Sequence, residues 1–188
     1  MKYIKYTDKT WTIENFLSEK ECQDLIIFSE MKGFQEAEVS LSSGSKMMKG
    51  IRNNDRLIFE DEQLAKKLWE KLETFCPEKI EDVIATGLNE RFRFYRYEGG
   101  QRFKRHIDGR FKKNDFEESR ITFMIYLNED FEGGETTFDE IQIKPKTGCA
   151  LCFIHEQKHE SIPIRHGVKY VLRSDVMYAS HSEKAKLN

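Results

Sequence analysis

The stretches RFRFYRY (residues 91–97) and RITFMIYL (residues 120–127) decide the fold class of this chain. Each alternates with a period of two residues, which is typical of a β-strand whose two faces have different surroundings. The residues on the apolar face of the second stretch are Ile121, Phe123, Ile125 and Leu127. Further strands are predicted over residues 140–144, 149–155 and 167–178. Glycine pairs at 99–100 and 133–134 punctuate these runs, so the C-terminal half is predicted to be a set of short strands joined by turns.

The N-terminal part shows the helical period instead. Residues 18–21 (SEKE) form a capping box, which predicts a helix from about residue 19 to just before Gly33. Leucines recur every three or four positions between Asp61 and Phe75, which predicts a second helix. Helices first and strands afterwards predict an α+β fold with a mainly antiparallel sheet or sandwich.

Length and composition are those of one compact domain. The chain has 188 residues, and we expect helical support over about residues 1–90 and the β core over about residues 91–178. Its 31 basic and 33 acidic residues give a formal charge of -2, so neither nucleic acid nor a membrane is an expected partner. There is no apolar signal segment and no run near the roughly 18 apolar residues of a membrane span, so we expect a cytoplasmic protein.

Cys149 and Cys152 form a C-x-x-C pair inside a predicted buried strand. Residues three apart in a strand point to opposite faces, so the two thiols do not converge on one ion. We interpret both as small core residues.

His106 and Asp108 give the strongest chemical signal. In an extended segment, residues i and i+2 point to the same side, so an imidazole and a carboxylate can reach one ion. A histidine from a distant strand would complete a two-histidine, one-carboxylate site, which binds non-haem Fe(II) and leaves coordination positions open. The H-x-D motif alone is weak evidence, because such pairs are common on surfaces. The histidines that follow it are His155, His159, His166 and His181.

Four blocks of sequence, in the same order, resemble the motifs of the 2-oxoglutarate- and Fe(II)-dependent dioxygenase superfamily, in its prolyl 4-hydroxylase-like branch. They lie at residues 97–108, 125–138, 144–151 and 159–175, and the whole region of resemblance is about half of the chain. The resemblance implies a double-stranded β-helix core, of the jelly-roll or cupin type, braced by the N-terminal helices. It also implies Fe(II), 2-oxoglutarate as co-substrate and O2, with L-ascorbate as a candidate addition.

The resemblance also assigns the metal ligands, as His106, Asp108 and His159. In the family, a basic residue about ten positions after the distal histidine binds the far carboxylate of 2-oxoglutarate, and Lys169 stands at that interval from His159. One departure is Ser161, which stands where the family often has glycine.

The remaining histidines receive other interpretations. His166 lies three residues before Lys169, an odd separation that points the two side chains to opposite faces, so it is interpreted as a turn histidine. His155 either orients groups near the site or simply packs there. His181 lies in a polar tail that we expect to be frayed.

Other residues are expected to line the pocket. Tyr97 and Tyr126 occupy positions that in the resembling family offer hydroxyl groups to 2-oxoglutarate, and Thr136 or Thr137 is a further candidate. The candidates for substrate contact are Arg93, Arg173 and Tyr95. The two arginines either bind a substrate carboxylate or peptide carbonyl, or pair with acidic residues of the sheet. The segment at 47–56 and the loop at 110–119 are also candidates for substrate contact.

The reaction that the resemblance implies is the oxidative decarboxylation of 2-oxoglutarate to succinate, coupled to hydroxylation of an unactivated C–H bond. The branch favours a prolyl residue in a protein or peptide as substrate. A free amino acid or small metabolite is the alternative, because the compact chain lacks the peptide-binding domain of collagen-type enzymes. A non-catalytic jelly-roll binding or sensor module is the alternative from a different class.

Overall fold

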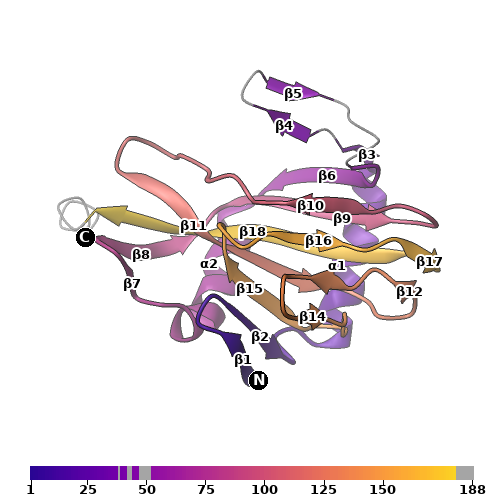
Figure 1. The fold of residues 1–188 in the computed structure, drawn as a ribbon, viewed down its shortest axis with the longest axis horizontal. Coiled ribbons are helices and arrows are strands. Elements are labelled where there is room, and N and C mark those ends of the chain that lie inside the picture. Colours follow the sequence, from indigo (N-terminus) through magenta and orange to yellow (C-terminus); the bar gives the residue numbers. More distant parts are fainter. Residues whose placement is uncertain (38, 42–43, 47–51, 181–188) are drawn as a thin grey trace.

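The computed structural model describes residues 1–37, 39–41, 44–46 and 52–180, and its largest unit is a ten-stranded sheet (Figure 1). The strands of this main sheet are β1 (Lys2–Thr7), β2 (Thr10–Glu14), β3 (Gln35–Glu36), β6 (Asp55–Glu60), β7 (Lys79–Ile80), β8 (Val83–Leu88), β9 (Arg91–Tyr97), β11 (Glu117–Tyr126), β15 (Ala150–Ile154) and β18 (Lys169–Ser180). Their order is β1-β2-β15-β11-β18-β9-β6-β3, and β8 also pairs with β18 and with β7. The pairs are antiparallel, as the sequence predicted.

A second layer of short strands lies against part of the main sheet. Its four-stranded sheet has the order β10-β16-β13-β14, made by β10 (Phe103–His106), β16 (His159–Ser161), β13 (Thr136–Thr137) and β14 (Gln142–Ile143). Two separate two-stranded sheets are also present. One pairs β12 (Glu132–Gly133) with β17 (Ile164–His166), and the other pairs β4 (Val39–Leu41) with β5 (Gly44–Lys46). The predicted sandwich is therefore confirmed, with unequal layers.

The two predicted helices are present and cover one face of the main sheet (Figure 1). Helix α1 (Glu19–Lys32) begins with the predicted capping box, in which Ser18 and Glu21 each accept the other's backbone N–H. Helix α2 (Glu62–Leu72) begins after Asp61, whose carboxylate accepts the Leu64 N–H, and continues into a short 3-10 turn over Glu73–Phe75. Across the described ranges, no helix has the length and apolar character needed to cross a membrane.

The alternation of β11 separates two hydrophobic cores. Ile121, Phe123 and Ile125 pack in the core beneath the helices, whereas Tyr126 packs in the core between the two sheets. The same rule settles the C-x-x-C pair: Cys152 belongs to the helix-side core and Cys149 to the core between the sheets. The prediction that both cysteines are core residues is confirmed.

The first ninety residues contain more strands than the sequence predicted. β1, β2, β6 and β8 all belong to the main sheet, so a description of this part as helical support alone is wrong. The five residues of β2 are too few to show a period. They become a strand because a partner from the far end of the chain completes them, with Ile13 opposite Ala150.

A backbone prediction follows from Gly148, which leads into β15. Its φ is 72°, and a β carbon there would collide with the carbonyl oxygen of Leu17. We expect Gly148→Ala to lower the free energy of unfolding by about 2 kcal/mol or more in urea denaturation, because left-handed backbone alone costs an alanine about 1–2 kcal/mol. Gly99→Ala is the control, since Gly99 faces open space, and should change stability by less than about 0.5 kcal/mol. Equal effects of the two changes would contradict this account.

Candidate metal centre

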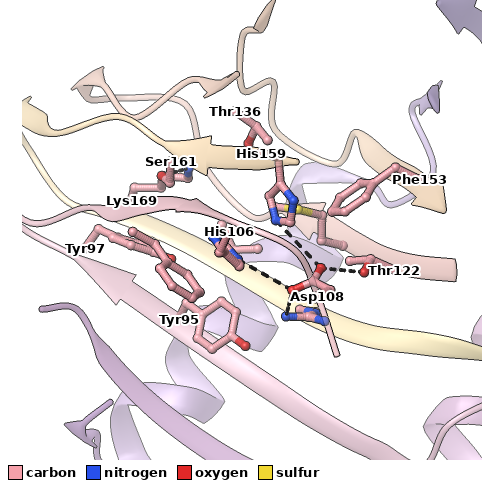
Figure 2. Close-up of a pocket in the computed structure, with 14 residues that line it drawn as sticks. Tyr95, Tyr97, His106, Asp108, Thr122, Thr136, Phe153, His159, Ser161 and Lys169 are labelled. Atoms are coloured by element: carbon pink, nitrogen blue, oxygen red, sulfur yellow. Dashed lines mark hydrogen bonds and ion pairs between the residues drawn. The ribbon is translucent and has the colours of Figure 1, made fainter. Parts of the chain in front are cut away.

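Three potential ligands converge where the two sheets face each other (Figure 2). His106 ends β10, Asp108 follows two residues later, and His159 begins β16. The two histidines lie opposite each other because β10 and β16 are paired. Nε2 of His106 lies 3.5 Å from Asp108 Oδ1, and Nε2 of His159 lies 3.7 Å from Asp108 Oδ2. One ligand atom from each of the three residues lies within 4.8 Å of the others.

The protein orients both imidazoles so that Nε2 is presented to the carboxylate. Nδ1 of His106 lies 2.7 Å from the Lys104 carbonyl oxygen, and Nδ1 of His159 lies 2.9 Å from that of Gln157. A carbonyl only accepts, so Nδ1 of each ring carries a proton and Nε2 is the nitrogen turned toward Asp108. Burial lowers the pKa of His159 to about 4, which keeps it neutral.

Asp108 is held as a carboxylate although it is only 7% exposed. Burial opposes its charge, but the Arg173 guanidinium holds the pKa of Asp108 well below its ordinary value. Arg173 lies 3.0 Å from Oδ1, and the Thr122 hydroxyl donates to Oδ2 at 2.7 Å.

These donors fit a divalent cation. The buried Nε2 of His106 has no hydrogen-bond partner, and a buried lone pair without a donor is costly unless a cation receives it. Two imidazoles and one carboxylate on one side of an ion are the facial set that suits Fe(II). The residues present therefore fit the metal that the sequence resemblance implied.

Beyond the three ligands, the pocket is lined by two cationic side chains, Arg173, which pairs with Asp108, and Lys169. Lys169 is 1% exposed, and its Nζ donates to Ser161 Oγ at 3.0 Å and to the Gly134 carbonyl at 2.5 Å. Among the described residues no ion pair joins Lys169 to a carboxylate. Burial lowers the pKa of Lys169 to about 7. In Figure 2, Lys169 and Tyr97 lie at one end of the pocket and Asp108 at the other.

Tyr97 and Thr136 line the pocket, whereas Tyr126 lies behind its wall. Tyr97 lines the pocket, with Nζ of Lys169 at 5.3 Å from its ring. Tyr126 is fully buried, and its hydroxyl lies 2.7 Å from Thr136 Oγ1. Thr136 itself lines the pocket, so Tyr126 supports the wall from behind.

The candidate substrate residues have different surroundings. Tyr95 lines the pocket, and although burial would raise its pKa, Arg52, Arg173 and Arg93 lower it to about 8. Arg93 and Arg173 both pair with Asp175, at 2.9 and 3.2 Å, which is the second of the two alternatives left open for them. Substrate contact by these residues stays a prediction.

The other histidines are accounted for by position. His166 is exposed at the end of β17, away from the three ligands. His155 is buried directly after β15 and contacts Thr122 rather than the other ligand candidates. His181 and residues 47–51 of the candidate entrance segment lie outside the described residues.

Sequence reasoning missed several residues of the pocket wall. Thr122 and Met124 line it because they share the face of β11 that carries Tyr126. The alternation of RITFMIYL contains that signal. No pattern in the sequence marked Phe103 or Phe153 as pocket residues. In the structure Phe103 stacks on His106 with 3.5 Å between ring centroids, and the ring centroid of Phe153 lies 4.5 Å from that of His159.

Comparisons with known proteins agree with this geometry. The model of the 2OG-Fe(II) oxygenase superfamily matches residues 92–175. Probable prolyl 4-hydroxylase 6 of Arabidopsis thaliana is 26% identical over 89% of this chain and 68% of its own length. Prolyl 4-hydroxylase 2 of the same plant is 24% identical over 87% of this chain and 62% of its own length.

Two solved structures show a similar fold. One is a prolyl hydroxylase from Trichoplax adhaerens in complex with a hypoxia inducible factor peptide fragment, with a TM-score of 0.70 and 21% identity over 97% of this chain and 88% of that one. The other is the viral collagen prolyl hydroxylase of Paramecium Bursaria Chlorella virus-1 with 2OG, with a TM-score of 0.66 and 23% identity over 92% of this chain and 96% of that one. The jelly-roll expectation is confirmed.

The ligand set can be tested with Mn(II) as an air-stable probe. We expect His106→Ala and His159→Ala each to weaken Mn(II) binding by more than about 100-fold, because each removes one of three donors. Loss of a residue that only supports a ligand typically weakens metal binding by about 10- to 100-fold. Electron paramagnetic resonance of free Mn(II) measures this. His166→Ala is the matched control and should bind as the unaltered protein does; a comparable loss in this control would contradict the assignment.

Proposed function

We propose that the chain is a 2OG-Fe(II) oxygenase that hydroxylates a prolyl residue of a protein or peptide. The match of the superfamily model to residues 92–175 and the prolyl 4-hydroxylase relatives support this proposal. The observation that carries this proposal is the placement of His106, Asp108 and His159 in one pocket with the buried cation of Lys169. A three-donor metal site beside a buried ammonium suits a co-substrate that chelates iron at one end and carries a carboxylate at the other.

In this proposal His106, Asp108 and His159 hold Fe(II), and Lys169 binds the far carboxylate of 2-oxoglutarate. Bound iron supplies the activation of O2, so that one oxygen atom enters succinate as carbon dioxide is released and the other becomes the hydroxyl of the product. Ser161 Oγ, which already accepts from Lys169, lies beside that carboxylate position.

The remaining lining residues have the task of excluding water and orienting the substrate. Phe103, Phe153 and Tyr97 supply aromatic walls, which lower the local dielectric and strengthen the attraction between Lys169 and an anion. Tyr95 and Phe103 add aromatic surface to the pocket wall, and the Arg52 guanidinium lies over both rings. The names of the relatives support a prolyl substrate, and the peptide complex of the Trichoplax adhaerens enzyme supports a peptide.

The test has two parts. In an anaerobic titration, Fe(II) and 2-oxoglutarate should produce a visible metal-to-ligand charge-transfer band that His159→Ala abolishes. In air, succinate release should rise with a proline-containing peptide, and mass spectrometry should find that peptide one oxygen atom heavier. Stimulation by free proline but not by peptides would replace the peptide proposal with the small-metabolite alternative. Absence of the band would overturn the oxygenase proposal in favour of a binding module.

Lys169 predicts how co-substrate affinity depends on pH. Its ammonium attracts the carboxylate, and in the free pocket its pKa is about 7. Above that pH, binding must first protonate Lys169, so affinity for 2-oxoglutarate should fall by up to about tenfold for each pH unit. Below that pH the amine is already charged and affinity should level off.

Titrations of the metal-loaded protein at several pH values measure this effect. The matched control is Lys169→Arg, because a guanidinium stays protonated throughout the range. We expect the affinity of this variant, although weaker overall, to lose the dependence on pH. The same slope in both proteins would show that Lys169 is not the group responsible.

A further inference from the structure

A line of three buried polar side chains leads from Asp108 away from the pocket. Thr122 Oγ1 lies 2.7 Å from Asp108 Oδ2 and 2.9 Å from Nδ1 of His155. Nε2 of the same imidazole lies 2.8 Å from Ser119 Oγ, which accepts the Phe111 N–H at 2.8 Å. The three side chains belong to residues that are at most 1% exposed, so bulk water offers them no alternative partners.

A β-bulge makes this line possible. Ser119 and Thr122 are three residues apart on β11, a spacing that points side chains to opposite faces of a regular strand. The pairing of β11 with β18 skips Arg120, which adds one residue to β11. The alternation is thereby reset, and Ser119 and Thr122 both reach His155.

A count of protons fixes the direction of every bond in the line. The Asp108 carboxylate only accepts, so the single hydroxyl proton of Thr122 lies between these two residues. Thr122 can then only accept from His155, which places the imidazole proton on Nδ1. Burial favours the neutral ring by lowering the pKa of His155, and a neutral ring protonated at Nδ1 accepts the Ser119 hydroxyl proton at Nε2. Ser119 in turn accepts the Phe111 N–H.

We propose that Ser119, His155 and Thr122 form a one-way hydrogen-bond relay that fixes the orientation of the Asp108 carboxylate in the metal site. His155 is a positioning residue in this relay, held as the neutral Nδ1–H tautomer. The inference deepens the proposed function, on which it rests in so far as Asp108 is a metal ligand.

The relay complements Arg173 on the other side of the carboxylate. Arg173 contacts Oδ1, and Thr122 donates to Oδ2. Each oxygen therefore has one protein donor, and rotation of the carboxylate would break both contacts. A metal ligand held at both oxygens needs no reorganisation when the cation arrives, which is the usual effect of partners behind a ligand.

The relay also closes a loop of the chain. Phe111, where the relay begins, lies three residues after Asp108, where it ends, and the Ser119 N–H donates back to the Phe111 carbonyl at 2.8 Å. Arg110 pairs with Glu118 at 2.7 Å and with Glu156 at 2.6 Å. These two glutamates are the sequence neighbours of Ser119 and His155. The loop that follows Asp108 is thus tied to the group that orients Asp108.

The tautomer of His155 is the first test, and it needs neither metal nor turnover. Heteronuclear NMR of the metal-free protein with isotope-labelled histidine distinguishes a protonated Nδ1 from a protonated Nε2. The His155→Gln spectrum identifies the His155 signals by their absence. The relay requires the proton on Nδ1; a proton on Nε2 in the unaltered protein overturns it, because Thr122 could then not donate to Asp108.

A double-mutant cycle on Mn(II) affinity is the second test. We expect Thr122→Val to weaken Mn(II) binding about 10- to 100-fold. Thr122→Ser keeps the hydroxyl group, so its Mn(II) affinity should stay within about threefold of that of the unaltered protein. Ser119→Ala, which does not touch Asp108, should weaken binding about tenfold in the unaltered protein but less than about twofold in the Thr122→Val background.

Ser29→Ala is the matched control for loss of a buried hydroxyl. Ser29 is fully buried, but its Oγ donates to the Ile26 carbonyl within α1, far from the site, so Mn(II) affinity should not change. Equal losses from Ser119→Ala in both backgrounds would overturn the relay, because the serine would then act without Thr122.

The two proposals fail separately. If the protein releases succinate but the His155 proton lies on Nε2, the relay is wrong and the proposed oxygenase reaction still stands. Mn(II) binding with the predicted tautomer and coupling, but without succinate release, would support the relay and overturn the proposed reaction.

Discussion

The buried carboxylate of Asp108 is the constraint on which the site depends. Removing a charge from water costs several kcal/mol unless partners replace the lost hydration, so the fold must bring donors to both oxygens. It does so with Arg173 from β18 and Thr122 from β11, two strands that are paired in the main sheet. The carboxylate is thereby ionised in the free protein, and its negative charge faces the two imidazoles that complete the candidate metal site.

Lys169 presents the opposite case, a buried cation without a carboxylate partner among the described residues. Its neighbours are the aromatic rings of Tyr97 and Tyr126 and two oxygen acceptors, which hold the ammonium in place but do not neutralise it. The Glu135 carboxylate favours the charged form of Lys169, but no ion pair joins the two within the described residues, so this end of the pocket favours an anionic ligand. The electrostatic contrast between the two ends of the pocket explains why a dicarboxylate that also chelates a metal fits the proposed function better than a neutral co-substrate.

Much of this site was predictable from the order of residues. Alternation identified β9 and β11, the i, i+2 rule placed His106 and Asp108 together, and strand parity separated Lys169 from His166. The capping box located α1. Each of these signals is local, because a strand or helix imposes its period on residues that are near in sequence. The distal histidine needed the resemblance to a family, since His159 approaches Asp108 only through the pairing of β10 with β16.

The sequence by itself therefore determined the class of fold, the period of its central strands and the chemistry available to the pocket. Only the tertiary structure decided the strand identity of β2, the pairing of Arg93 with Asp175 and of Arg173 with Asp108, and the relay through His155. These features depend on contacts between residues far apart in the chain, and the relay depends further on a single bulged residue that resets the alternation of β11. A pattern of period two cannot reveal where that period is interrupted, because the interruption is set by the partner strand.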